Sequence, residues 1–280
     1  MFDGPVDALW IENMNTVLDD NKKLCLNSGQ IITLTDRMTM MFEVEDLAVA
    51  SPATVSRCGM VYMEPESLGL EVLIKSYFNT LPPAFKTKKT FYPNLHKLFD
   101  TYFMAMKDFM RRNCGEPVKT MDNNITQSLH RILDCYFADY WETEIKKISS
   151  EEVENLESML EPLFLYALTW SICCTTDFGG RSKLDKQLKE MMKTANAKFK
   201  FPEQGMIYDY VFDQSEKRWK PWLETIPEYK PDIRSNYSEI VVPTHDSVRM
   251  KYLMNLLIRN KKHILFPGNT GTGKTVNVSE

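Results

Sequence analysis

A glycine-rich motif near the C-terminus constrains the fold more than any other feature of the sequence. It satisfies G-x-x-x-x-G-K-[ST] with Gly268, Asn269, Thr270, Gly271, Thr272, Gly273, Lys274 and Thr275. Glycines let backbone N–H groups close around phosphate oxygens, and a following helix directs its positive end at the same anion. The apolar run 263–267 stands directly before the motif. Together they predict a buried parallel strand, a phosphate-binding loop (Walker A) and a helix N-terminus.

Two side chains of this motif have defined expected roles. Lys274 is expected to reach the β- and γ-phosphates of a nucleotide, and Thr275 to ligate Mg²⁺. A chance glycine-rich turn is the alternative, but at an average glycine usage of about 7% such a match arises roughly once in a hundred chains of this size. A complete site also needs an acidic residue on a later strand. Because the sequence ends five residues after Thr275, we expect further polypeptide to complete the site.

The composition excludes several classes of protein. Hydrophobic residues make up 43% and charged residues 26% of the 280 residues, which is typical of globular domains, and the net charge of −4 argues against nucleic-acid binding. The sequence has no apolar run long enough to span a bilayer and no signal peptide. Its six cysteines and four histidines show no metal-ligand spacing. We therefore expect a soluble, intracellular protein from a reducing compartment, without nucleic-acid or membrane partners.

The first 60 residues predict an alternation of strands and helices. A strand ends abruptly within residues 1–5, and helical spacing follows over 6–20. Residues 24–26 and 31–34, on either side of an Asn-Ser-Gly-Gln turn, indicate a β-hairpin. Residues 38–44 predict another apolar strand.

Long stretches at both ends resemble a known family. Residues 2–7, 10–15 and 18–22 are similar to the Walker B region of the second AAA+ module of dynein heavy chains, and residues 53–61 to the arginine-finger segment of that module. The glycine-rich motif, preceded by 240–244, resembles the entry to the third module. Axonemal members are the more similar type.

The resemblance implies roles for residues of the first segment. Asp3 would be the Walker B carboxylate that holds Mg²⁺ in the second site. Gly4 stands where a hydrolysing module would carry a glutamate, so bound ATP should persist there rather than turn over. Glu12 comes too late to replace it. The sensor position falls on Glu43 or Glu45, and the sequence does not choose between them.

The resemblance also implies residues that contact nucleotide from neighbouring modules. Arg57 would be an arginine finger acting in trans on the preceding module, where such a group contributes about 10³–10⁵ in rate; a surface salt bridge is the alternative. Arg181 is a candidate sensor arginine. The adenine pocket would be lined by Val242, Pro243 and Thr244.

The middle of the chain is predicted to be helical. Two apolar stripes indicate helices that pack in a core: Leu95, Phe99, Tyr102, Phe103, Met106, Phe109 and Met110, and then Leu129, Ile132, Leu133, Tyr136, Phe137 and Tyr140. Ser149 and Glu152 form a capping box, and Pro162 should end or kink the helix that it opens. A hairpin is predicted near 207–223 and an amphipathic helix over 246–259.

These features predict an α/β AAA+ P-loop fragment. Residues 1–67 would be the C-terminal half of one large domain, 68–232 a helical lid with a β-hairpin, and 233–280 the opening strand, P-loop and helix of the next module. The resemblance implies a motor that uses ATP/ADP and Mg²⁺. Its partners would be neighbouring AAA+ modules, microtubules and dynein light and intermediate chains, in the cytoskeleton of a cilium or flagellum axoneme. The alternatives are a non-hydrolysing nucleotide-binding segment and a helical interaction scaffold.

Overall fold

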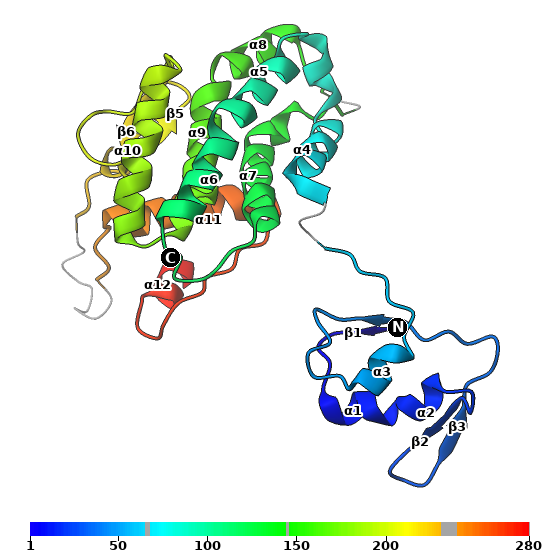
Figure 1. Cartoon of the computed structure of the whole chain (residues 1–280). Helices are drawn as coiled ribbons and strands as arrows, with labels where there is room; N and C mark the ends of the chain where they lie inside the picture. The colour runs from blue at the N-terminus through cyan, green and yellow to red at the C-terminus, as the bar shows by residue number, and fades with distance from the viewer. Residues whose placement is uncertain (65–67, 144–145, 231–239, 280) are drawn as a thin grey trace. The chain divides into compact units, whose positions relative to one another are not determined.

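The computed structural model describes residues 1–64, 68–143, 146–230 and 240–279. The chain divides into two compact units, Met1–Ser67 and Leu68–Glu280. The first contains β1 to β4 and α1 to α3, and the second contains the remaining helices and one β-hairpin (Figure 1). The predicted boundary at 232/233 lies outside the described residues.

The first unit is a small α/β structure. Its elements are β1 (Phe2–Asp3), α1 (Ala8–Asn13), α2 (Asn15–Leu18), β2 (Lys23–Cys25), β3 (Ile31–Thr33), β4 (Phe42–Glu43) and α3 (Pro52–Ser56). β1 pairs in parallel with β4, and β2 pairs with β3 in antiparallel register, with Leu24 opposite Ile32. The predicted hairpin is therefore confirmed.

Two elements predicted for this unit, a helix and a strand, are shorter in the structure than expected. The helix expected over 6–20 is interrupted at Met14, between Asn13 and Asn15, and asparagine disfavours helix interiors because its side chain competes for backbone hydrogen bonds. The strand expected over 38–44 is reduced to Phe42–Glu43, because β1, its partner among the described residues, is only two residues long. A strand extends only as far as its backbone groups find partners.

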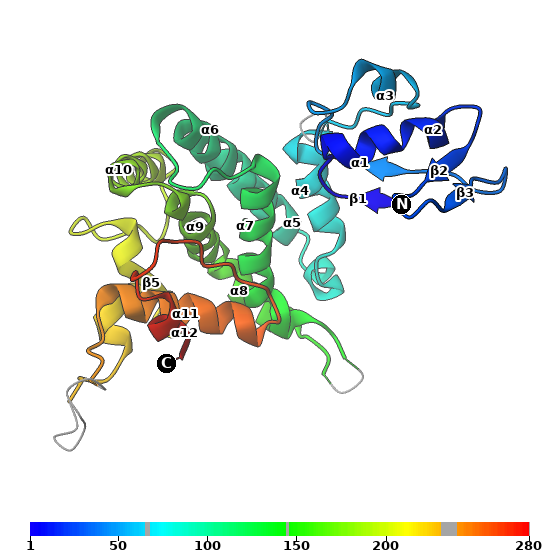
Figure 2. The same ribbon diagram turned by 90° about the horizontal axis from the view of Figure 1, so that it is seen from below.

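The second unit is built around one buried helix. Its helices are α4 (Gly69–Asn79), α5 (Phe91–Leu98), α6 (Met104–Asn113), α7 (Asp122–Phe137), α8 (Ser150–Ser158), α9 (Leu160–Ser171), α10 (Phe178–Thr194), α11 (His245–Arg259) and α12 (Lys274–Ser279). Every residue of α9 except Glu161 is buried, as expected of a helix that is apolar on all sides. Both views place α9 between α7 and α10 (Figure 1, Figure 2).

The predicted apolar stripes form this core. In the first stripe all members but Phe109 are buried, along α5, a π-helical turn (Phe99–Phe103) and α6. In the second stripe Tyr136 and Tyr140 are partly buried and the other members are buried. Both stripes are thus confirmed as core.

The capping box is also confirmed, because Ser149 Oγ accepts from Glu152 N and the Glu152 carboxylate accepts from Ser149 N. The helix that it opens, α8, ends before Met159. Pro162 lies in the first turn of α9, where a missing N–H removes no intrahelical bond. The break between α8 and α9 therefore lies at Met159, three residues before Pro162.

A hairpin and one further helix complete the core. β5 (Tyr210–Asp213) pairs with β6 (Arg218–Pro221) in antiparallel register, which confirms the second predicted hairpin. The predicted amphipathic helix is α11, which lies against the core through Tyr252, whose ring is 5.4 Å from that of Trp222. Just beyond α11, Lys262 Nζ is 2.7 Å from Asp134 Oδ2 on α7.

The strand predicted over 263–267 is not formed. This stretch has no regular secondary structure, and Leu265 is 87% exposed. A parallel strand needs neighbouring strands for its N–H and C=O groups. The sheets among the described residues are three separate pairs, and none includes this segment.

His130 of α7 makes a testable contribution to stability. Its ring stacks on Tyr77 with 3.9 Å between ring centroids, and its Nε2 is buried without a hydrogen-bond partner among the described residues. Burial lowers the pKa of His130 to about 4. The unfolded chain binds this proton near pH 6.5, but the folded chain does not, so the free energy of unfolding should fall as the pH drops from 6.5 towards 4.

We expect the wild-type polypeptide to lose about 2 kcal/mol more than a His130→Phe variant between pH 7 and pH 4.5. Phenylalanine keeps the stacking and removes the titration. Urea unfolding at the two pH values measures the difference, and equal losses in both proteins would show that His130 does not titrate in this way.

Candidate functional site

The glycine-rich loop leads directly into α12, whose first residue is Lys274. Gly271 and Gly273 have φ angles of +82° and +74°, a backbone region that favours glycine over residues with a Cβ atom. The loop is therefore curved by the residues that the motif places there. The loop-to-helix half of the predicted junction is formed, and the strand half is not.

Lys274 lies across the loop that precedes it. Its Nζ donates hydrogen bonds to Gly268 O at 2.8 Å and to Asn269 O at 2.6 Å. Thr272 Oγ1 also donates to Asn269 O, at 2.9 Å. The ammonium group is thus held inside the curve of the backbone, and a lysine in this position suits the phosphates of a nucleotide. Thr275 follows in the first turn of α12.

The residues predicted to line an adenine pocket lie just before α11. Val242 is 58% exposed, and Pro243 is half-buried. Thr244 is the N-cap of α11, because its Oγ1 accepts from Ser247 N at 3.2 Å. The structure thus gives Thr244 a capping role. α11 itself contacts α12, which carries Lys274 (Figure 2).

Arg181 is engaged within the helical unit. It lies in the first turn of α10, donates from Nη2 to Cys174 O at 3.4 Å, and its guanidinium lies 5.5 Å from the Tyr208 ring centre. Within the described part of the chain, no hydrogen bond or ion pair joins Arg181 to the glycine-rich loop. Arg181 and the glycine-rich loop are therefore not in direct contact within the described residues.

In the first unit, two acidic residues lie opposite each other at the end of the parallel strand pair. Asp3 ends β1 and is directly opposite Glu43 in β4. Glu45 lies beyond the end of β4. Of the two sensor candidates, Glu43 is thus the one aligned with Asp3.

Gly4, which follows Asp3, donates its N–H to Glu43 O at 3.1 Å. Its φ angle is +148°, a conformation that residues with side chains rarely adopt. The backbone at this position is therefore one that suits glycine and disfavours glutamate.

Arg57 is an exposed residue at the C-terminal end of α3. Its Nε and Nη2 donate to the carboxylate of Asp19, and its Nη1 donates to Ala53 O at 2.6 Å. The hydrogen bond to Asp19 is the main cause that raises the pKa of Arg57 above its usual value. The ion pair considered as an alternative role is thus present, and the guanidinium remains accessible.

Comparisons with known proteins decide the family. Residues 95–224 match the dynein heavy chain AAA lid domain, and residues 229–280 match the P-loop containing dynein motor region. The chain is 44% identical over its whole length to dynein axonemal heavy chain 1 of Mus musculus and 43% identical to that of Homo sapiens; it is 38% identical over 98% of its length to dynein axonemal heavy chain 3 of Mus musculus. This chain belongs to the dynein heavy chain family. It spans about 7% of the length of these relatives.

The dynein assignment confirms the predicted family and fold class. The helices from Leu95 to the β5–β6 hairpin are the dynein AAA lid, and α11 and α12 belong to the P-loop motor region. In this dynein segment the lid and α11 pack together: Tyr252 of α11 contacts Tyr166 and Trp222, with ring centroids 6.0 and 5.4 Å apart.

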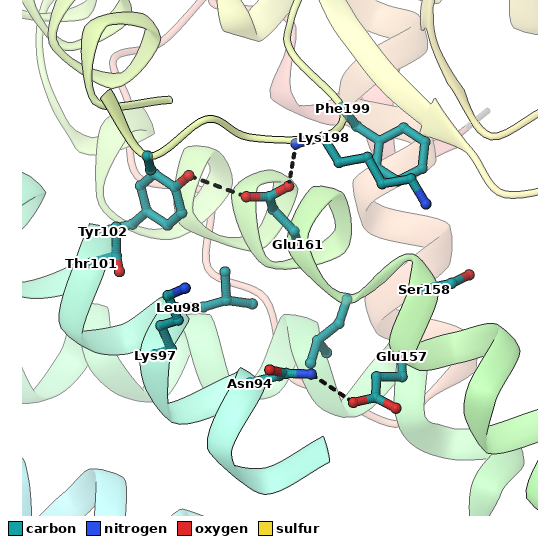
Figure 3. Close-up of a pocket in the computed structure, with 12 residues that line it drawn as sticks. Asn94, Lys97, Leu98, Thr101, Tyr102, Glu157, Ser158, Glu161, Lys198 and Phe199 are labelled. Carbon is teal, nitrogen blue, oxygen red and sulfur yellow. Dashed lines mark hydrogen bonds between the residues drawn. The ribbon is translucent and has the colours of Figure 1, made fainter. Parts of the chain in front are cut away.

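The dynein lid also carries a pocket that the sequence did not indicate (Figure 3). Its volume is about 240 Å³, and it lies between α5, the α8–α9 junction and the segment after α10. Glu161 accepts hydrogen bonds there from Tyr102 Oη at 3.2 Å and Lys198 N at 2.9 Å, and Asn94 Nδ2 donates to Glu157 at 2.6 Å. The lining residues come from distant parts of the sequence and carry no motif, so local patterns could not reveal the pocket.

The part of the chain that the structure describes contains no group of three or more His, Cys, Asp or Glu side chains able to hold a metal ion. None of the described helices is long and apolar enough to cross a membrane.

Proposed function

We propose that this segment supplies two partial nucleotide sites to an ATP-driven motor that moves along microtubules. The loop around Lys274 would bind the phosphates of ATP or ADP at the entry to the third AAA+ module. Arg57 would reach the nucleotide of the first module from the second. Mg²⁺ would shield the phosphate charge and orient its oxygens, held by Thr275 in one site and by Asp3 in the other.

The observation that carries this proposal is the geometry of the glycine-rich loop. Lys274 Nζ already lies against the carbonyls of Gly268 and Asn269, at the start of a helix and inside a curve made by two glycines of positive φ. A cation in a curved backbone is the arrangement that binds a nucleotide polyphosphate. A helical interaction scaffold does not require a phosphate-binding loop of this geometry.

Microtubule gliding driven by the intact heavy chain tests the proposal. Gliding should require ATP and should slow when either Lys274 or Arg57 is replaced by alanine. Unchanged gliding in both variants would contradict the proposed motor role of this segment.

The same proposal implies the partners and the location of the protein. The partners would be neighbouring AAA+ modules, microtubules, and light and intermediate chains, and the location would be the axoneme of a cilium or flagellum.

Gly4 favours a second, regulatory function for the second module. Without a glutamate beside Asp3, bound ATP would have no general base to orient water. The nucleotide would then persist as a structural ligand, while hydrolysis takes place elsewhere in the ring.

A Gly4→Glu substitution should not create hydrolysis at the second module, because the backbone at this position disfavours a glutamate. The backbone at φ +148° would strain a glutamate by roughly 1–3 kcal/mol, and relaxing it would disturb the bond from Gly4 N to Glu43 O. We expect unchanged ATP turnover and a lower melting temperature of the intact heavy chain. A new phase of ATP hydrolysis assigned to the second module would show that the backbone accommodates a glutamate at this position, and that the missing side chain alone prevents hydrolysis.

A further inference from the structure

The side chain of Arg57 is held by two neighbours that leave part of it free. A guanidinium carries five N–H bonds. Asp19 accepts from Nε and from Nη2, and Ala53 O accepts from Nη1. Among the described residues no other acceptor contacts Arg57, so one N–H remains on each terminal nitrogen. N–H groups on the two terminal nitrogens of a guanidinium can donate to phosphate oxygens.

The helix that carries Arg57 is fixed by a second contact, one turn away. Thr54 is 1% exposed, and its Oγ1 donates to Asn15 Oδ1 at 2.8 Å. Asn15 and Asp19 lie at the two ends of α2, and Thr54 and Arg57 lie one turn apart on α3. Two side-chain contacts, Thr54 to Asn15 and Arg57 to Asp19, thus join α3 to α2. Together they fix the orientation of α3 about its axis and the position of the Arg57 side chain.

We propose that Asp19 is a positioning residue that orients Arg57 for contact with phosphate on the neighbouring module. This inference rests on the proposed finger role of Arg57. Asp19 accepts from the Nε and Nη2 side of the guanidinium, holds the side chain in one position, and leaves one N–H on each terminal nitrogen for a phosphate oxygen. Without Asp19 the exposed side chain would sample several rotamers, and a catalytic group misplaced by about 1 Å costs on the order of 100-fold in rate.

Asp20 provides a matched control for substitutions of Asp19. Asp20 is the next residue, carries the same charge and is exposed, and it forms no hydrogen bond or ion pair within the described residues. An Asp20→Asn change removes one charge from the same surface and leaves Arg57 bound. An Asp19→Glu change keeps the carboxylate with one more methylene group.

The test is single-turnover ATP hydrolysis at the first module of the intact heavy chain. Asp19→Asn should lower kcat by between about tenfold and about 100-fold with little change in KM; Asp19→Glu should recover most of the loss, and Asp20→Asn should match the wild type. Because Asp19 acts through Arg57, the double variant Asp19→Asn/Arg57→Ala should be no slower than Arg57→Ala alone.

The outcomes distinguish the positioning role of Asp19 from the finger role of Arg57. If Arg57→Ala slows hydrolysis and Asp19→Asn does not, the positioning role is wrong and the finger role stands. The positioning role is also wrong if the two losses multiply in the double variant, or if Asp19→Asn raises KM and leaves kcat unchanged. If Arg57→Ala itself has no effect, the finger role fails, and the positioning role fails with it.

Discussion

Replacing Lys274 with alanine should remove Mg-ATP binding at the third AAA+ module of the intact heavy chain. The substitution deletes the one ammonium group that the loop holds among its carbonyls. Hydrogen bonds to charged groups contribute about 1.5–3 kcal/mol each, and two such bonds to the β- and γ-phosphates correspond to a loss of roughly 10²–10⁴ in affinity.

Equilibrium binding of a fluorescent ATP analogue measures this effect as a change in stoichiometry, because other modules of the heavy chain also bind nucleotide in this account. The variant should bind one fewer analogue per chain than the wild type at micromolar concentrations. Lys251→Ala, which removes an exposed lysine of α11, should leave the stoichiometry unchanged. Equal stoichiometry and affinity in the wild type and Lys274→Ala would show that the loop does not bind nucleotide.

Replacing Arg57 with alanine should slow ATP hydrolysis at the first module by about 10³–10⁵. The guanidinium would stabilise charge that spreads over the transferred phosphoryl group. Among the described contacts, the Asp19 carboxylate pairs only with Arg57. Removal of Arg57 also leaves that carboxylate unpaired, which adds repulsion towards phosphate.

Single-turnover hydrolysis with ATP bound at the first module measures this loss. Nucleotide binding should change much less than kcat, since the contact strengthens as the transition state forms. Arg37→Ala removes another exposed arginine of the same unit and should retain the wild-type rate. A rate for Arg57→Ala within a few-fold of the wild type would contradict the finger role.

Local signals in the sequence predicted the local features of this fold well. The capping box of Ser149 and Glu152, both hairpins and the apolar stripes depend on residues a few positions apart, so their spacing is visible without the fold. The glycine-rich motif likewise predicted the loop and the start of α12, because both depend on adjacent residues.

Features that depend on distant partners were not predictable. The run 263–267 has the composition of a buried strand, but strand formation requires neighbours that local spacing cannot supply. The Arg57–Asp19 and Lys262–Asp134 pairs join residues 38 and 128 positions apart, and no short-range pattern selects one acidic partner among the 38 carboxylate residues of the chain. The family resemblance supplied candidate roles for such residues, and the structure supplied their contacts.

In the assembled motor, Lys274 and Arg57 are both expected to contact nucleotide phosphate. An experimental structure of the intact heavy chain with a transition-state analogue of ATP hydrolysis measures both contacts at once. We predict Lys274 Nζ and at least one terminal nitrogen of Arg57 within about 3 Å of phosphate oxygens or their analogues, with Asp19 still accepting from Nε of Arg57. Nucleotide in both sites, with Lys274 still directed only at Gly268 and Asn269 and Arg57 far from any phosphate, would contradict the account.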